Sequence, residues 1–243
     1  MAQTLAVAAA TLDLLASGAI RLEGQFVWGS NTTFLARLRR GAVELLAVYK
    51  PQRGERPLWD FPGGTLAARE AAAWHVSDAL GWELVPPTVL RRDGPFGPGS
   101  LQLFLALDPQ RHYFTFGDEE KERLRPVVVF DILVNNADRK AGHVLLGEDG
   151  HLWLIDHGVC FHVEPKLRTV IWDFAGQPIP ARLLDDVDRF GRDLEGAGPL
   201  RSALTDLLAM EEVDALRRRA TEIVETGRFP LPGPGRPYPW PLV

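Results

Sequence analysis

The sequence is short of the features that mark several classes of protein. It contains one cysteine, Cys160, so no disulfide can form within the chain, and a reducing, cytoplasmic location is expected. No run of residues is long and apolar enough to cross a membrane. An excess of positive charge is also missing, because the formal net charge is −5, which argues against a general nucleic-acid-binding protein. No internal repeat is visible.

What is present is typical of a globular protein. The 243 residues are 46% hydrophobic and 24% charged, and this length fits one large domain or two small lobes. The first residues resemble a signal peptide only superficially, because they lack a basic start and Asp13 interrupts the apolar run. Their apolar positions recur at helical spacing, which predicts an amphipathic helix ending at Gly18.

The front half combines strand and helix patterns. Residues 32–40 and 43–50 are strand candidates joined as a hairpin, and a loop rich in proline and glycine follows them. Residues 65–81 predict an alanine-rich helix, with a threonine as possible N-cap and a glycine as its stop. Residues 94–99 are expected to form a loop, and residues 101–108 a strand.

The back half changes character at Pro126. An apolar, buried segment over residues 127–134 precedes two short strands, and residues 181–226 have helical patterns. The tail, residues 229–243, has six prolines and is expected to lie extended on the surface. The sequence therefore predicts an α+β fold of two lobes: a β-rich N-lobe, residues 1–107, and a mainly helical C-lobe, residues 108–243.

Three polar residues stand among the buried-looking segments of the back half. Asp149-Gly150 is a strong hairpin signal, and a two-residue turn there would place His143 directly opposite Asp156. Asp138 lies in the loop that feeds the first strand of this hairpin. Two carboxylates and an imidazole are suited to a divalent cation, and phosphoryl transfer uses two carboxylates in this way.

Phosphoryl transfer needs further groups, for which the front half has candidates. Lys50 ends a predicted strand, on the same face as Leu46 and Val48. Glu70 lies in the alanine-rich helix. The small-residue loop "GSNTT", residues 29–33, could cradle phosphate oxygens with its backbone N–H groups.

Three motifs in order carry a resemblance to a known family. They are "AVYKP" at residues 47–51, "DILVNNADR" at 131–139 and "LIDHG" at 154–158. They resemble the lysine strand, the catalytic loop and the Asp-x-Gly metal motif of the phosphatidylinositol 3-/4-kinase-related family. The similarity runs roughly from residue 29 to 180, and is nearest to the type II phosphatidylinositol 4-kinases and to actinobacterial relatives.

The resemblance implies a protein-kinase-like fold and an ATP-dependent kinase that transfers the γ-phosphate to a hydroxyl. It implies that Asp138, Arg139 and Lys50 are the catalytic residues. Asp138 would orient or deprotonate the acceptor, and Arg139 follows it in the catalytic loop. Lys50, positioned by Glu70, would contact the α- or β-phosphate.

The same resemblance implies a site for Mg²⁺ or Mn²⁺. Asp156 would bind the metal with His143, at a position where the family usually has Asn. His143 could instead be a structural histidine. The other positions expected to contact ATP are Gly29, Ser30, Asn31, Thr32, Leu103, Phe104, Leu105, Leu145 and Ile155.

Two other functions fit these residues. A nucleotide-binding pseudokinase, acting as a regulatory module, is suggested by His143, whereas the intact Lys50, Asp138 and Asp156 argue against it. An enzyme that transfers AMP is the second alternative. A protein, a lipid headgroup and a small molecule all remain open as the acceptor. The acidic chain shows no basic amphipathic helix for a membrane surface.

Overall fold

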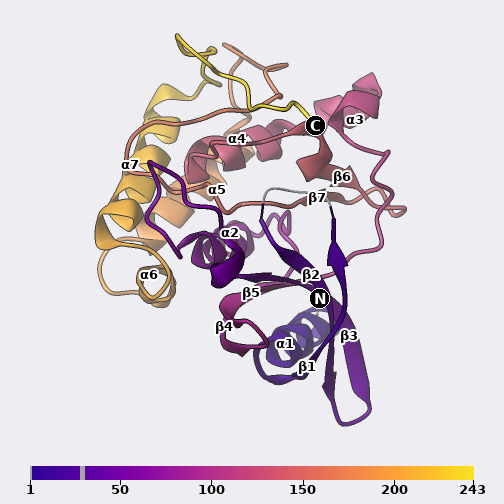
Figure 1. The fold of residues 1–243 in the computed structure, drawn as a ribbon. Helices are drawn as coiled ribbons and strands as arrows, with labels where there is room; N and C mark the ends of the chain where they lie inside the picture. The colour runs from indigo at the N-terminus through magenta and orange to yellow at the C-terminus, as the bar shows by residue number, and fades with distance from the viewer. Residues whose placement is uncertain (1, 28–30) are drawn as a thin grey trace.

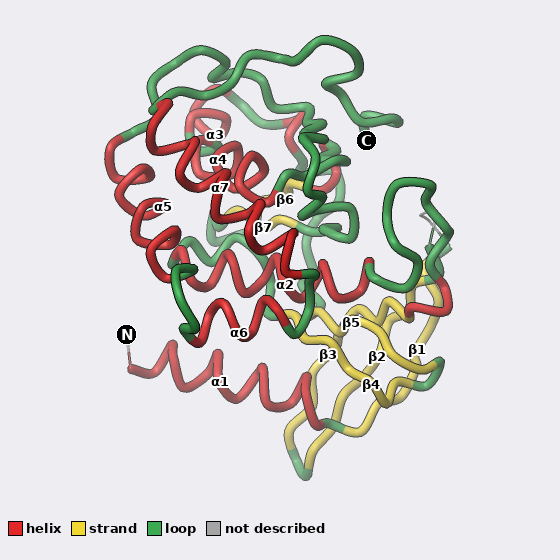
Figure 2. The backbone as a smooth tube through the Cα atoms, turned by 90° about the vertical axis from the view of Figure 1, so that its left-hand side faces the viewer, coloured by secondary structure: helices red, strands yellow, loops and turns green. Residues whose placement is uncertain are grey.

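The computed structural model describes residues 2–27 and 31–243, and it has two lobes (Figures 1 and 2). The N-lobe is built on one antiparallel sheet with the strand order β1-β2-β3-β5-β4. Its elements are α1 (Ala2–Ser17), β1 (Ala19–Phe26), β2 (Thr33–Arg40), β3 (Val43–Pro51), η1 (Gln52–Gly54), α2 (Leu66–Leu80), β4 (Thr88–Gly94) and β5 (Gly97–Leu103).

The C-lobe is mainly helical and contains one two-stranded hairpin, β6–β7. Its elements are η2 (Tyr113–Thr115), α3 (Asp118–Glu122), α4 (Arg125–Val134), η3 (Ala141–His143), β6 (Val144–Leu146), β7 (Leu152–Leu154), α5 (Ala181–Asp193), α6 (Pro199–Thr205) and α7 (Met210–Thr226). The predicted α+β architecture is confirmed. No helix in the described ranges is long and apolar enough to cross a membrane.

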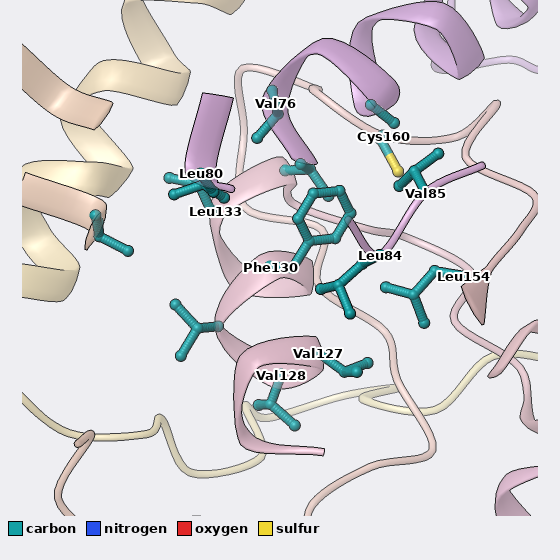
Figure 3. Packing of buried hydrophobic residues seen from close by; sticks show 14 of the residues in the cluster. Val76, Leu80, Leu84, Val85, Val127, Val128, Phe130, Leu133, Leu154 and Cys160 are labelled. Carbon is teal, nitrogen blue, oxygen red and sulfur yellow. The ribbon is translucent and has the colours of Figure 1, made fainter. Parts of the chain in front are cut away.

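Two hydrophobic cores underlie the two lobes. The smaller lies between the sheet and α1, which buries Leu14 and Leu15 against strand residues such as Leu38. The larger joins α2 to the C-lobe: Val76 and Leu80 of α2 belong to the same cluster as residues of α4 (Figure 3). Helix α2 also packs on β4 and β5. It therefore links the sheet to the helical lobe, and the boundary at residue 107 stays a prediction.

Strand β3 presents two different faces, because side chains alternate along a strand. Ala47 and Tyr49 are fully buried in the smaller core. Leu46, Val48 and Lys50 point to the opposite face of the sheet, which carries α2. This alternation turns the Lys50 side chain toward the space between the lobes.

Residues 94–99 form a tight β4–β5 hairpin, so the prediction of a loop there is wrong. The cause is the packing of Tyr49, whose hydroxyl donates to the Gly97 carbonyl oxygen at 2.6 Å. A Cβ atom at Gly99 would lie 2.6 Å from Cε2 of Tyr49. Glycine is needed here for close packing, not for a flexible loop. Strand β5 ends at Leu103, earlier than expected.

The buried segment at residues 127–134 belongs to helix α4, and the long helical pattern near the C-terminus divides into α6 and α7. The proline-rich tail is extended, as predicted, and crosses the end of the C-lobe away from the sheet (Figure 1). It is fixed by backbone hydrogen bonds: Pro237 and Leu242 carbonyl oxygens accept from the N–H groups of Thr169 and Ala141 at 3.0 and 2.8 Å.

Candidate active site

A charged cluster joins the lobes at Lys50. Its ammonium group forms an ion pair with Glu70 of α2 and lies 3.0 Å from Oδ1 of Asp156, just after β7. The second oxygen of Glu70 accepts the backbone N–H of His157 at 2.8 Å. The Glu70 side chain is 4% exposed and that of Asp156 49% exposed. Glu70 therefore lies behind Lys50, and Asp156 is open to solvent.

Lys50 and Asp156 each stabilise the charged form of the other. Burial disfavours the charge on Lys50, but attraction to Asp156 and Glu70 outweighs burial and raises its pKa. Attraction to Lys50 holds the pKa of Asp156 well below its usual range. Burial raises the pKa of Glu70, against the pull of Lys50. Lys50 and Asp156 are consequently both charged at neutral pH.

The register predicted for the hairpin is wrong by one residue. Val144 pairs with Leu154, and the Gly147 N–H donates to the His151 carbonyl oxygen at 2.8 Å. The turn therefore has three residues, 148–150, and ends on Gly150 with a φ of 78°. Asp-Gly also suits this longer turn, in which glycine takes the left-handed position.

His143 and Asp156 nevertheless meet, because the backbone turns at the open end of the hairpin. His143 ends the short helix η3, and Asp156 has a left-handed φ of 62°. Nε2 of His143 lies 3.3 Å from Oδ2 of Asp156. The predicted contact is therefore present, although strand pairing is not its cause.

The protonation of His143 bears on metal binding. Burial lowers its pKa to about 4, so the ring is neutral at physiological pH. Nδ1 lies 3.1 Å from the Asp138 carbonyl oxygen, to which it can donate, and 3.5 Å from the backbone N of Lys140, from which it can accept, so the tautomer sets its role. When Nδ1 carries the proton, Nε2 presents a lone pair toward Oδ2 of Asp156. In that tautomer a cation could be bound by both groups.

These two residues fit a metal that is held partly by a phosphate. The described residues contain no group of three or more His, Cys, Asp or Glu side chains poised to hold a metal ion. A carboxylate and an imidazole leave most coordination positions to water and phosphate oxygens. That pattern is usual for the divalent cations of phosphotransfer sites.

Asp138 lies at the edge of the same site. Its side chain is 30% exposed, and Lys140 Nζ lies 3.4 Å from Oδ2. Burial raises the pKa of Asp138 to about 6, although Lys140 opposes the shift. The backbone N–H of Asp138 donates to Oδ1 of Asn136 at 2.9 Å, which fixes the loop. A carboxylate of this kind suits the acceptance of a proton near neutral pH.

Arg139 lies behind the site and not in it. Its side chain is fully buried and forms an ion pair with the buried Asp131 at 2.9 Å. The guanidinium also donates to the carbonyl oxygens of His143 and Ile155, at 3.2 and 3.0 Å. Within the described residues these contacts place Arg139 behind the His143 and Asp156 side chains, and the catalytic role expected of it stays a prediction.

The expected phosphate loop is only partly described. Gly29 and Ser30 lie outside the described residues. Oδ1 of Asn31 accepts the backbone N–H of Arg56 at 2.9 Å, and the Thr32 N–H donates to the Gly54 carbonyl oxygen at 3.1 Å. Asn31 and Thr32 are therefore tied to the segment that follows β3.

The five apolar positions expected at the nucleotide lie where the lobes meet or inside the C-lobe. The Leu103 and Phe104 N–H groups donate to the Pro87 and Leu46 carbonyl oxygens, at 2.8 and 2.9 Å. Leu105 follows in the linker between the lobes. Leu145 is buried on β6, while Ile155 is half-buried, and its N–H donates to the His143 carbonyl oxygen at 3.1 Å.

A cavity of about 460 Å³ opens beside Asp138, and sequence reasoning missed most of its lining. Arg56, Leu58 and Trp59 come from the segment after β3, and Arg168 follows the hairpin. The available signal was a tryptophan in a loop rich in proline and glycine. That signal alone does not say which part of the protein the loop covers.

Comparisons with known proteins place the chain in a family. No model of a known protein family matches it. Protein Rv2133c of Mycobacterium tuberculosis is 44% identical to it, over 94% of each chain. The chain belongs to the Rv2133c family.

The resemblance of this Rv2133c-family chain to phosphatidylinositol kinases is also confirmed. The sequence identity is lower than that to Rv2133c. Phosphatidylinositol 4-kinase gamma 4 of Oryza sativa is 35% identical over 45% of this chain and 22% of its own length. Phosphatidylinositol 4-kinase gamma 2 of Arabidopsis thaliana is 29% identical over 51% of this chain and 29% of its own length. The chain thus spans less than a third of these plant enzymes.

Solved kinase structures share the fold of this Rv2133c-family chain. The Golgi casein kinase with Mn and ADP bound has a TM-score of 0.58 at 16% identity, covering 90% of this chain and 75% of its own. The structure of hydra Fam20 has a TM-score of 0.55 at 17% sequence identity, and the match covers 89% of this chain and 87% of Fam20. The Helicobacter pylori kinase CtkA has a TM-score of 0.53 at 13% sequence identity, and the match covers 88% of this chain and 94% of CtkA. The two-lobed, kinase-like fold is therefore confirmed.

Proposed function

We propose that the protein is an ATP-dependent phosphotransferase that transfers the γ-phosphate of ATP to a hydroxyl acceptor. The observation that carries the proposal is the Lys50 cluster, in which one ammonium group contacts both Glu70 and Asp156 across the lobes. The kinase-like fold and the match to phosphatidylinositol 4-kinases support it.

Lys50 would bind the α- or β-phosphate of ATP. Its raised pKa keeps it protonated. Glu70 fixes the position of the ammonium group from the buried side, so the exposed side is left for a phosphate. Glu70 is itself fixed by the His157 N–H. A lysine held in this way supplies positive charge where phosphate charge accumulates during transfer.

Asp156 and His143 would hold Mg²⁺ or Mn²⁺. When bound, such an ion neutralises phosphate charge and orients the terminal phosphate. Asp156 remains ionised through its pairing with Lys50, and neutral His143 offers Nε2. Arg139 would fix both ligands through the carbonyl oxygens of His143 and Ile155.

Asp138 would accept the proton of the acceptor. The hydroxyl oxygen attacks the γ-phosphorus, and the bond from that phosphorus to the bridging oxygen breaks. ADP leaves with the electron pair, and the proton moves to the Asp138 carboxylate. The raised pKa of about 6 makes this carboxylate a stronger base than an exposed aspartate.

The products formed from ATP test the proposal. With Mg²⁺ or Mn²⁺ and water as the only acceptor, ³¹P NMR should show slow formation of ADP and phosphate, and Asp138→Ala should stop it. Formation of AMP and pyrophosphate would instead show an AMP transferase. Tight ATP binding without any product would show a pseudokinase.

A further inference from the structure

The cavity beside Asp138 has the composition of a binding site. Its walls are largely apolar and include Leu58 and Trp59. Two arginines, Arg56 and Arg168, and two aspartates, Asp60 and Asp138, also line it. Its volume of about 460 Å³ falls in the range of small-molecule sites. Apolar walls with a few polar groups are typical of pockets that orient a small organic ligand.

In the part of the chain that the structure describes, the two arginines differ from the nearby lysines because no ion pair compensates their charges. Lys50 pairs with Glu70 and Asp156, Lys140 with Asp138, and Lys166 with Asp60. Within the described residues, the guanidinium groups of Arg56 and Arg168 have no ion pair or hydrogen bond, and only their backbones do. Arginine side chains free beside a cavity are suited to carboxylate or phosphate.

Backbone contacts fix both arginines next to the reacting groups. The Arg168 N–H donates to the Asn136 carbonyl oxygen at 2.9 Å, and the Arg139 N–H donates to the Arg168 carbonyl oxygen at 3.0 Å. Arg168 is thereby paired with the catalytic loop on both sides of Asp138. The Arg56 N–H is bonded to Asn31 in the expected phosphate loop.

The loop that supplies Trp59 is held over the cavity by the C-lobe. Oδ2 of Asp60 lies 3.0 Å from Lys166 Nζ, and this pair is nearly buried. The Lys166 ammonium lies 5.2 Å from the Trp59 ring, and Phe61 packs against His162. Trp59 itself is 91% exposed, so its ring is open to contact with a ligand.

We propose that this cavity is the acceptor site, and that the acceptor is a small organic anion with a hydroxyl group and an apolar ring or chain. Arg56 and Arg168 would bind its anionic group, Trp59 and Leu58 would contact its apolar part, and its hydroxyl would face Asp138. The assignment rests on the proposed function only for the role of Asp138. The transfer step is the one given above.

Two matched probes test the site without nucleotide. 4-Hydroxyphenylacetate has a ring, a hydroxyl and a carboxylate, and tyrosol is its uncharged counterpart. Titration followed by ¹H NMR should give saturable binding of the acid at about 1 mM or below, and weaker binding of tyrosol. Arg56→Ala and Arg168→Ala should each weaken binding of the acid about tenfold, with little effect on tyrosol. Trp59→Ala should weaken both.

Two variants serve as controls. Arg53→Ala removes an exposed arginine from the same segment, and Trp240→Ala removes an exposed tryptophan from the tail. Neither residue lines the cavity, so neither change should alter binding of the acid. Absence of saturable binding, or equal binding by wild type and an Arg56→Ala, Arg168→Ala double variant, would overturn the assignment.

Further experiments distinguish a small-molecule acceptor from a peptide or a lipid, and this inference from the proposed function. Transfer of labelled γ-phosphate to an acidic serine peptide or to anionic lipid vesicles, unaffected by the double arginine change, would overturn the small-molecule class. If ATP binds but the acid does not, this inference fails and the proposed function stands. If the acid binds but ATP does not, the proposed function fails.

Discussion

Nζ of Lys50 and Oδ1 of Asp156 lie 3.0 Å apart, although the two residues are 106 positions apart in the sequence. One residue lies on β3 of the N-lobe sheet and the other follows β7 of the C-lobe. Their ion pair therefore depends on the relative position of the two lobes. A phosphate and a cation placed between them would each find a group of opposite charge already fixed there.

Lys50→Met should weaken ATP binding and also lower stability. The change leaves the Glu70 carboxylate without its cation at a position that is 4% exposed. A buried polar group left without its partner costs about 1–3 kcal/mol, and a charged one costs more. Urea denaturation measures this loss, and adding Glu70→Gln should recover part of it. An unchanged free energy of unfolding in Lys50→Met would show that the pair is not formed.

Asp138→Asn should stabilise the metal-free protein at pH 7 but not at pH 4. Burial raises the folded-state pKa of Asp138 to about 6, above the unfolded value of about 3.9. The stability linked to its protonated form is complete below about pH 4 and is lost as pH rises through 6. Thermal unfolding of both proteins between pH 4 and 8 measures the difference. A gap that does not grow with pH would contradict the raised pKa.

Arg139→Ala should be strongly destabilising, by about 3–5 kcal/mol, because it leaves buried Asp131 without its partner. Arg139→Met combined with Asp131→Leu should recover stability in part. This double variant should still bind ATP poorly with metal, because the guanidinium that bridges the carbonyl oxygens of His143 and Ile155 is then missing. Denaturation and ATP titration together test the positioning role. Full recovery of both properties would reduce Arg139 to a purely structural residue.

His143→Asn should shift the metal preference from Mn²⁺ toward Mg²⁺. Imidazole nitrogen is accepted more readily by Mn²⁺, whereas Mg²⁺ prefers oxygen ligands such as the amide of asparagine. The pKa of about 4 means that His143 stays neutral above pH 5, so its protonation should not limit metal binding there. The ratio of ATP affinities with the two metals measures the preference. An unchanged ratio in a folded variant would remove His143 from the metal site.

Much of the fold could be predicted because it follows local rules. The helix before Gly81 is rich in alanine and has a glycine stop, and the strand ending near Lys50 is followed by a loop rich in proline and glycine; both elements are present. The β4–β5 hairpin could not be predicted, because glycines that make room for the Tyr49 ring are indistinguishable in sequence from loop glycines. The three-residue turn at Gly150 shares the Asp-Gly signal of a two-residue turn.

Part of the candidate site could be predicted from the sequence, and part of it could not. Spacing and resemblance brought out Lys50, Asp138 and Asp156, since these residues stand next to recognisable strands and loops. The buried position of Arg139 depends on its partner Asp131 and on carbonyl groups distant in sequence. The cavity wall at Trp59 depends on a long-range ion pair, Asp60 with Lys166, which no local pattern signals.

Isothermal titration of ATP with Mg²⁺ or Mn²⁺ is the most direct test of the central claim, that the cluster around Lys50 and Asp156 binds ATP and its metal. Wild type should bind at sub-millimolar ATP. Asp138→Ala should bind within about threefold of wild type, because the residue addresses the acceptor. Asp156→Ala should bind at least about tenfold more weakly with metal, because a charged ligand is lost. No binding by folded wild type at millimolar ATP, or the same affinity in the two variants, would contradict the account.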